Sequence, residues 1–138
     1  MFNKSLLPSI VWAIAILVLI MVPGSSFGNT SWLKFPHFDK LVHFVLFFVF
    51  GGLLFFGLVC QKSINDRGWA LWVYFSIIGV GYAILTEYIQ WAFINSRKGS
   101  IWDALANILG LYVGVWLANW IIKKQKNLFS RFFQPQND

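Results

Sequence analysis

The chain has 138 residues, of which 58% are hydrophobic and only 12% are Asp, Glu, Lys or Arg. Soluble globular domains carry about 25% charged residues, so this composition excludes a soluble domain and predicts an all-α integral membrane protein in one domain, residues 1–138. The net charge of +6 does not predict nucleic-acid binding, because much of the basic excess lies at predicted helix ends, where Lys and Arg contact anionic lipid headgroups. The single cysteine, Cys60, cannot form an internal disulfide and is expected to fill apolar space.

Four apolar stretches follow one another, and each is expected to cross the bilayer as a helix. A transmembrane helix needs about 20 residues to cross about 30 Å of hydrocarbon. The predicted helices cover residues 6–22, 41–59, 69–93 and 101–122, and a basic cytoplasmic tail follows at 123–138. The first stretch shares features with a signal peptide, since Lys4 precedes it and small residues follow it, but its apolar length favours a retained helix.

The distribution of Lys and Arg predicts the orientation of the bundle. The side of the two termini carries Lys4, Lys62, Arg67, Lys123, Lys124, Lys126 and Arg131. The opposite side carries Lys34, Lys40, Arg97 and Lys98. Because cytoplasmic segments of membrane proteins are enriched in Lys and Arg, both termini are expected in the cytoplasm.

Polar side chains interrupt the apolar pattern at the predicted outer ends of the third and fourth helices. Glu87 and Gln90 lie three residues apart and so share a helix face, and Asp103 and Asn107 lie one turn apart on the next helix. A charged residue within a membrane span costs about 2.5–3.5 kcal/mol on insertion scales, so such residues normally pair or face a polar cavity. Arg97, in the short loop between the two helices, is the expected partner of Glu87.

One face of the fourth helix is predicted to point into the bundle. Asp103, Asn107, Gly110 and Gly114 fall at offsets of 0, 4, 7 and 11 residues, which share a face at about 3.6 residues per turn. The glycines would allow a neighbouring backbone to approach closely. Ser100 and Asp103 also fit a capping box, so Asp103 has a structural interpretation beside a functional one.

The second helix opens with a charged segment. Asp39 is the predicted N-cap, and His43 lies one turn further along the same face, after Lys40. His43 is a candidate general base with acidic partners, and a hydrogen-bonded structural role is the alternative. His43, Glu87 and Asp103 would also suit a divalent ion, but no closely spaced ligand pair marks a metal site, and neither a metal nor a cofactor is assigned.

Taken in order, these polar residues resemble the pattern of the VanZ-like family. The motifs are Asp39-Lys40-x-x-His43, Glu87-x-x-Gln90, Arg97, and Asp103-x-x-x-Asn107-x-x-Gly110 followed by Gly114. Order and spacing agree over residues 36–115. The resemblance implies a small multi-pass protein of the bacterial plasma membrane, and the founding member of the family is associated with low-level teicoplanin resistance.

Three functions are compatible with this polar cluster. The preferred hypothesis is an outward-facing site that binds or processes an envelope lipid, a lipid-linked wall precursor or an amphiphilic glycopeptide, with membrane lipids as further partners. The candidate binding residues are Asp39, Lys40, His43, Glu87, Gln90, Arg97, Asp103 and Asn107. The alternatives are a membrane-embedded enzyme that uses His43, and a bundle in which the polar network is only structural.

Overall fold

The structure is a computed structural model that describes residues 4–21, 38–61, 64, 68–93 and 100–132. A short 3-10 turn, η1 (Lys4–Leu6), leads into α1 (Leu7–Met21), which is followed by α2 (Phe38–Val59), α4 (Gly68–Phe93) and α5 (Ile101–Phe132). No strand occurs in these residues. The predicted all-α four-helix bundle is confirmed.

Four helical segments are long and apolar enough to cross a membrane. They are Lys4–Met21, Phe38–Val59, Gly68–Phe93 and Ile101–Gln125. Large apolar side chains such as Leu109 and Trp116 are exposed on the outside of the bundle, where the hydrocarbon of a bilayer would cover them. The chain is therefore a multi-pass membrane protein.

Two helices extend further than the apolar pattern predicts. The helix α2 already begins at Phe38, so Asp39 lies in its first turn rather than at the N-cap position. The helix α5 continues to Phe132, beyond the predicted end at residue 122, so the predicted tail begins as helix. Lys and Gln, which follow the apolar stretch, are good helix formers, and a change from apolar to polar side chains does not by itself end a helix.

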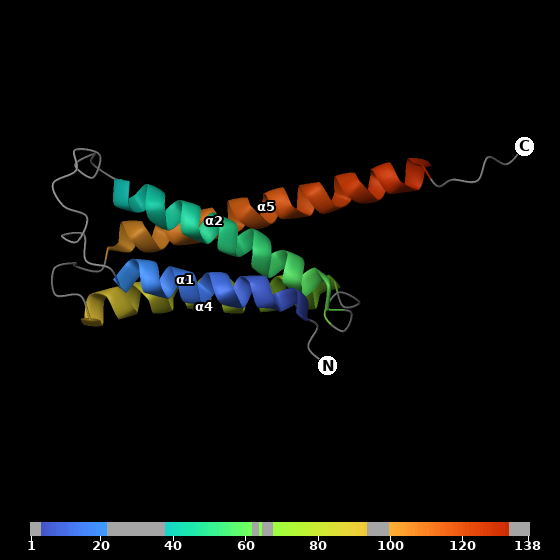
Figure 1. Cartoon of the computed structure of the whole chain (residues 1–138). Coiled ribbons are helices and arrows are strands. Elements are labelled where there is room, and N and C mark those ends of the chain that lie inside the picture. The colour runs from blue at the N-terminus through green and yellow to red at the C-terminus, as the bar shows by residue number, and fades with distance from the viewer. Residues whose placement is uncertain (1–3, 22–37, 62–63, 65–67, 94–99, 133–138) are drawn as a thin grey trace, which may run out of the picture.

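The four helices alternate in direction. The start of α1 and the end of α5 lie at one end of the bundle, and the starts of α2 and α5 lie at the other (Figure 1). The helix α1 lies beside α4, and α2 packs along α5, which is the most extensive helix pair in the bundle (Figure 1). The assignment of the termini to the cytoplasmic side stays a prediction.

Glycines set the close contact between α2 and α5. A Cβ added at Gly110 would clash with the Phe44 carbonyl oxygen, and one at Gly114 would clash with that of Phe48. Both glycines are buried on the face of α5 that also carries Asn107, which is fully buried. The prediction that this face points into the bundle is confirmed.

Hydrogen bonds attach α1 to the other helices at several heights. Trp12 Nε1 donates to the Leu46 carbonyl oxygen of α2 at 2.9 Å. The Tyr82 hydroxyl of α4 donates to the Ala13 carbonyl oxygen at 2.5 Å. Because Ile16 on the same helix is fully buried, α1 forms part of the core that supports the polar end of the bundle.

Candidate functional site

The polar residues gather at the end of the bundle where α2 and α5 begin and α4 finishes. His43 lies in the second turn of α2, Glu87 in the last two turns of α4, and Asp103 and Asn107 in the first two turns of α5. These helices are far apart in sequence, and their alternating directions bring the four side chains to one depth. The structure therefore brings together four residues that the sequence analysis assigned to one polar cluster.

Three of these side chains form a buried network, here called the inter-helix triad, which consists of His43, Glu87 and Asn107. Asn107 Nδ2 donates to Glu87 Oε1 at 2.9 Å, and His43 Nδ1 lies 3.0 Å from Asn107 Oδ1. His43 Nδ1 also lies 3.4 Å from Glu87 Oε1. Because both neighbours of Nδ1 are acceptors in this arrangement, the network assigns a proton to that nitrogen.

The triad connects one side chain from each of α2, α4 and α5. His43 and Asn107 are almost completely buried, with 2% and 0% of their surfaces exposed. Polar groups removed from water need partners, because an unpaired one costs about 1–3 kcal/mol. The triad therefore fixes the relative positions of three helices, whatever else it does.

A second, more open pair lies beside the triad. Lys40 Nζ lies 3.4 Å from Asp103 Oδ1, and 34% of the Lys40 side chain is exposed against 11% for Asp103. Asp103 lies in the first turn of α5, where a carboxylate also interacts favourably with the helix dipole. Its backbone N donates to the Ser100 carbonyl oxygen at 3.0 Å, so Ser100 and Asp103 belong to the helix start, while the side-chain bonds of a capping box stay a prediction.

Two buried carboxylate oxygens have unused hydrogen-bonding capacity. Neither Glu87 Oε2 nor Asp103 Oδ1 accepts a hydrogen bond from the part of the chain that the structure describes. Asp103 Oδ1 has the Lys40 ammonium nearby, but their contact is an ion pair rather than a hydrogen bond. Both oxygens can therefore accept a hydrogen bond from a donor outside the described residues.

The acidic part of the site also has a geometry that suits a cation. Asp39, His43 and Asp103 each offer a ligand atom, and these atoms lie within 4.8 Å of one another. This set differs from the one considered from the sequence, because Asp39 takes the place of Glu87. One imidazole with two carboxylates would suit several divalent ions, but the Lys40 ammonium already lies at Asp103 and would compete with them.

Of the predicted site residues that the structure describes, Gln90 is not part of this arrangement. Gln90 Nε2 donates to the Ile20 carbonyl oxygen at 3.3 Å, so Gln90 joins α4 to α1. Residues three apart on a helix differ by about 60° around its axis, which lets Glu87 face α5 while Gln90 faces α1. Arg97, the predicted partner of Glu87, lies outside the described residues.

Two polar residues of α4 had no role in the sequence analysis. The Thr86 hydroxyl is fully buried and donates to the Ala83 carbonyl oxygen one turn earlier, at 2.8 Å. The Tyr82 hydroxyl donates to the Ala13 carbonyl oxygen of α1. A hydroxyl residue within an apolar helix was the only sequence signal, and it does not reveal which backbone carbonyl is the partner.

The fold and the site define a small multi-pass α-helical membrane protein with a buried polar network and an open ion pair at one end. The model of the VanZ/LLP1 family matches residues 6–123, which include α1, α2, α4 and most of α5. The chain therefore belongs to the VanZ/LLP1 family. No curated protein and no solved structure shows a significant match to the chain.

Proposed function

We propose that the protein binds an amphiphile of the bacterial cell envelope at the outer face of the plasma membrane, with the headgroup at Lys40 and Asp103. The observation that carries this proposal is the Lys40–Asp103 pair, which is charged and partly exposed beside an otherwise buried network. Surface ion pairs contribute only about 0–1 kcal/mol to stability. Helix packing alone therefore gives little reason for an ammonium at this position.

The charge balance of the described site favours a ligand that is rich in hydrogen-bond donors. Asp39, Glu87 and Asp103 provide three carboxylates, against the single ammonium of Lys40. Two of their oxygens, on Glu87 and Asp103, have capacity for a further donor. Amines, amides and sugar hydroxyls would meet these acceptors, whereas Lys40 would meet a phosphate or carboxylate. A lipid-linked wall precursor or a lipoglycopeptide carries both kinds of group together with an apolar tail.

Family membership supports a link between this site and glycopeptides. The VanZ-like resemblance points to teicoplanin, which carries a lipid tail and acts outside the membrane. An outward-facing site that binds either teicoplanin or its wall-precursor target would change how much drug reaches that target. Under this proposal the protein contributes to resistance by binding, and no reaction is required.

Neutral replacements of the open pair test this proposal. Lys40→Gln and Asp103→Asn are compared with Lys123→Gln, which removes an exposed charge at the opposite end of α5. Binding of teicoplanin and of a lipid-linked wall precursor is measured on protein in nanodiscs. We expect both site variants to bind about tenfold more weakly, which corresponds to 1.4 kcal/mol, while Lys123→Gln binds like the wild type. Equal binding by all three variants would refute the proposal.

A purely structural role is the second candidate, and the closed inter-helix triad favours it. If the whole polar cluster only joins helices, every variant that weakens binding must also lower protein abundance in the membrane. Under the binding proposal, Lys40→Gln keeps normal abundance and loses binding. Measuring abundance and binding on the same membranes separates the two candidates.

The enzyme alternative keeps one supporting observation. With the proton on Nδ1, the other ring nitrogen of His43 is the basic one, as in sites where a carboxylate orients a histidine base. Wild-type and His43→Ala protein can be incubated with envelope lipids and lipid-linked wall precursor and the products analysed by mass spectrometry. A product that requires His43 would favour this alternative over simple binding.

A further inference from the structure

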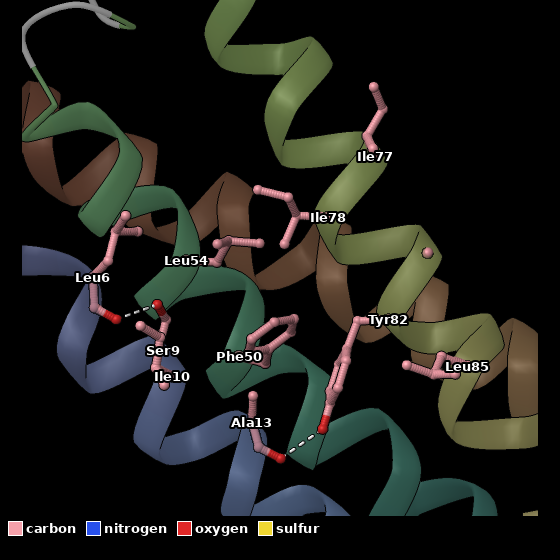
Figure 2. Close-up of a pocket in the computed structure, with 11 residues that line it drawn as sticks. Leu6, Ser9, Ile10, Ala13, Phe50, Leu54, Ile77, Ile78, Tyr82 and Leu85 are labelled. Atoms are coloured by element: carbon pink, nitrogen blue, oxygen red, sulfur yellow. Dashed lines mark hydrogen bonds between the residues drawn. The ribbon is translucent and has the colours of Figure 1, made fainter. Parts of the chain in front are cut away.

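A cavity of about 380 Å³ lies between α1 and α4, away from the polar cluster. Phe50 and Leu54 of α2 form its floor, and both are buried (Figure 2). Ile10 of α1 and Ile77 of α4 line its two sides and are 53% and 67% exposed. The cavity is therefore a groove that opens sideways, toward the space around the bundle.

The polar side chains in the groove already have partners. The Ser9 hydroxyl donates to the Leu6 carbonyl oxygen at 2.7 Å, and the Tyr82 hydroxyl donates to that of Ala13 at 2.5 Å. Figure 2 shows both hydrogen bonds along the edge of the groove. The surface that a bound molecule would contact in the groove is therefore almost entirely apolar.

Gly81 gives the groove part of its width. A Cβ added at this glycine would meet no atom within 4 Å, in contrast to the glycines between α2 and α5. Gly81 lines the groove on the α4 side. A larger side chain at this position would therefore fill the groove without clashing with the protein.

We propose that this groove binds one hydrocarbon chain of a membrane lipid. Both helices that border it span the membrane, so the medium at its opening is the hydrocarbon of lipid tails. The volume lies in the range of about 300–1,000 Å³ that is typical of ligand pockets. The site is independent of the polar cluster and goes beyond the proposed function.

Photo-cross-linking tests this inference on the full chain in nanodiscs. The bilayer contains phosphatidylcholine that carries a diazirine on one acyl chain, and adducts are mapped by mass spectrometry. We expect adducts to be enriched at Ile10 and Ile77 relative to Trp116, which faces lipid elsewhere on the bundle. The enrichment should be lost in Gly81→Leu and kept in Gly68→Leu, because Gly68 also has open space around it but does not line the groove.

The result that overturns the inference is an even distribution of adducts, or an enrichment that Gly81→Leu leaves unchanged. Circular dichroism checks that Gly81→Leu is folded, and Ile10→Trp fills the groove from the opposite side as a second variant. A single cysteine at Ile77 in a Cys60→Ser background tests for a second copy of the chain. Disulfide-linked dimers through that cysteine, without adducts in the groove, would assign the surface to a protein contact instead.

Discussion

The close contact between α2 and α5 makes a quantitative prediction about Gly114. A Cβ at Gly114 would clash with the Phe48 carbonyl oxygen and would lie 2.9 Å from the carbonyl carbon and 3.1 Å from Gly52 N. These atoms belong to the backbone of α2, so they cannot rotate away as a side chain would. The two helices must separate, and overpacking of this kind typically costs about 1–3 kcal/mol.

A matched control isolates the packing contribution from helix propensity. Alanine stabilises a helix by about 0.8–1.0 kcal/mol relative to glycine, and this gain applies both to Gly114→Ala and to Gly81→Ala. Gly81 has open space at its Cβ position, so Gly81→Ala carries the propensity gain without a clash. The unfolding free energies of the two variants should therefore differ by about 1–3 kcal/mol, with Gly114→Ala less stable.

The unfolding free energy can be measured by titrating purified protein in mixed micelles with sodium dodecyl sulfate. Circular dichroism or tryptophan fluorescence reports the transition. Gly110→Ala provides a second test, since its Cβ would clash with the Phe44 carbonyl oxygen in the same way. If Gly114→Ala and Gly110→Ala were as stable as Gly81→Ala, the close contact between α2 and α5 would be refuted.

Two further predictions concern hydrogen bonds between helices, and the same titration measures both. Asn107→Ala removes the bridge between His43 and Glu87 and should cost about 1–3 kcal/mol, since it deletes one buried and one partly buried hydrogen bond. A cost no larger than that of an exposed substitution would contradict the triad. Tyr82→Phe removes the bond to the Ala13 carbonyl oxygen and should cost about 0.6–1.7 kcal/mol; no change in stability would show that this bond does not attach α1.

The four helices could be predicted because the bilayer restricts the possible structures. Backbone groups in hydrocarbon must be bonded within the helix, and the thickness of the bilayer sets the length of each span. The helix ends could not be predicted equally well, since α5 continues through polar residues to Phe132. A hydropathy pattern marks where the chain leaves the hydrocarbon, not where the helix ends.

The sequence predicted that the polar residues gather at one end of the bundle, but it did not predict how they pair. The spacing of Asp103, Asn107 and the glycines predicted which face of α5 points into the bundle, and that face is buried. The pairing of Asn107 with Glu87 depends on how the helices are arranged around the bundle, which no spacing within one helix reveals. For the same reason Gln90, one turn from Glu87, contacts α1 instead of the cluster.

The polar end of the bundle combines two layers with different physical roles. In the deeper layer, His43, Glu87 and Asn107 contact one another through polar atoms. Removing any of them leaves an uncompensated polar group, so stability and function would change together. In the outer layer, Lys40 is about one-third exposed, and Lys40→Gln keeps an N–H donor for the buried Asp103 carboxylate, so we expect this variant to cost about 1 kcal/mol of stability. Lys40 is therefore the residue whose replacement can lower ligand binding with little loss of folding stability. A variant such as Lys40→Gln that folds normally and loses binding cannot be explained by helix packing.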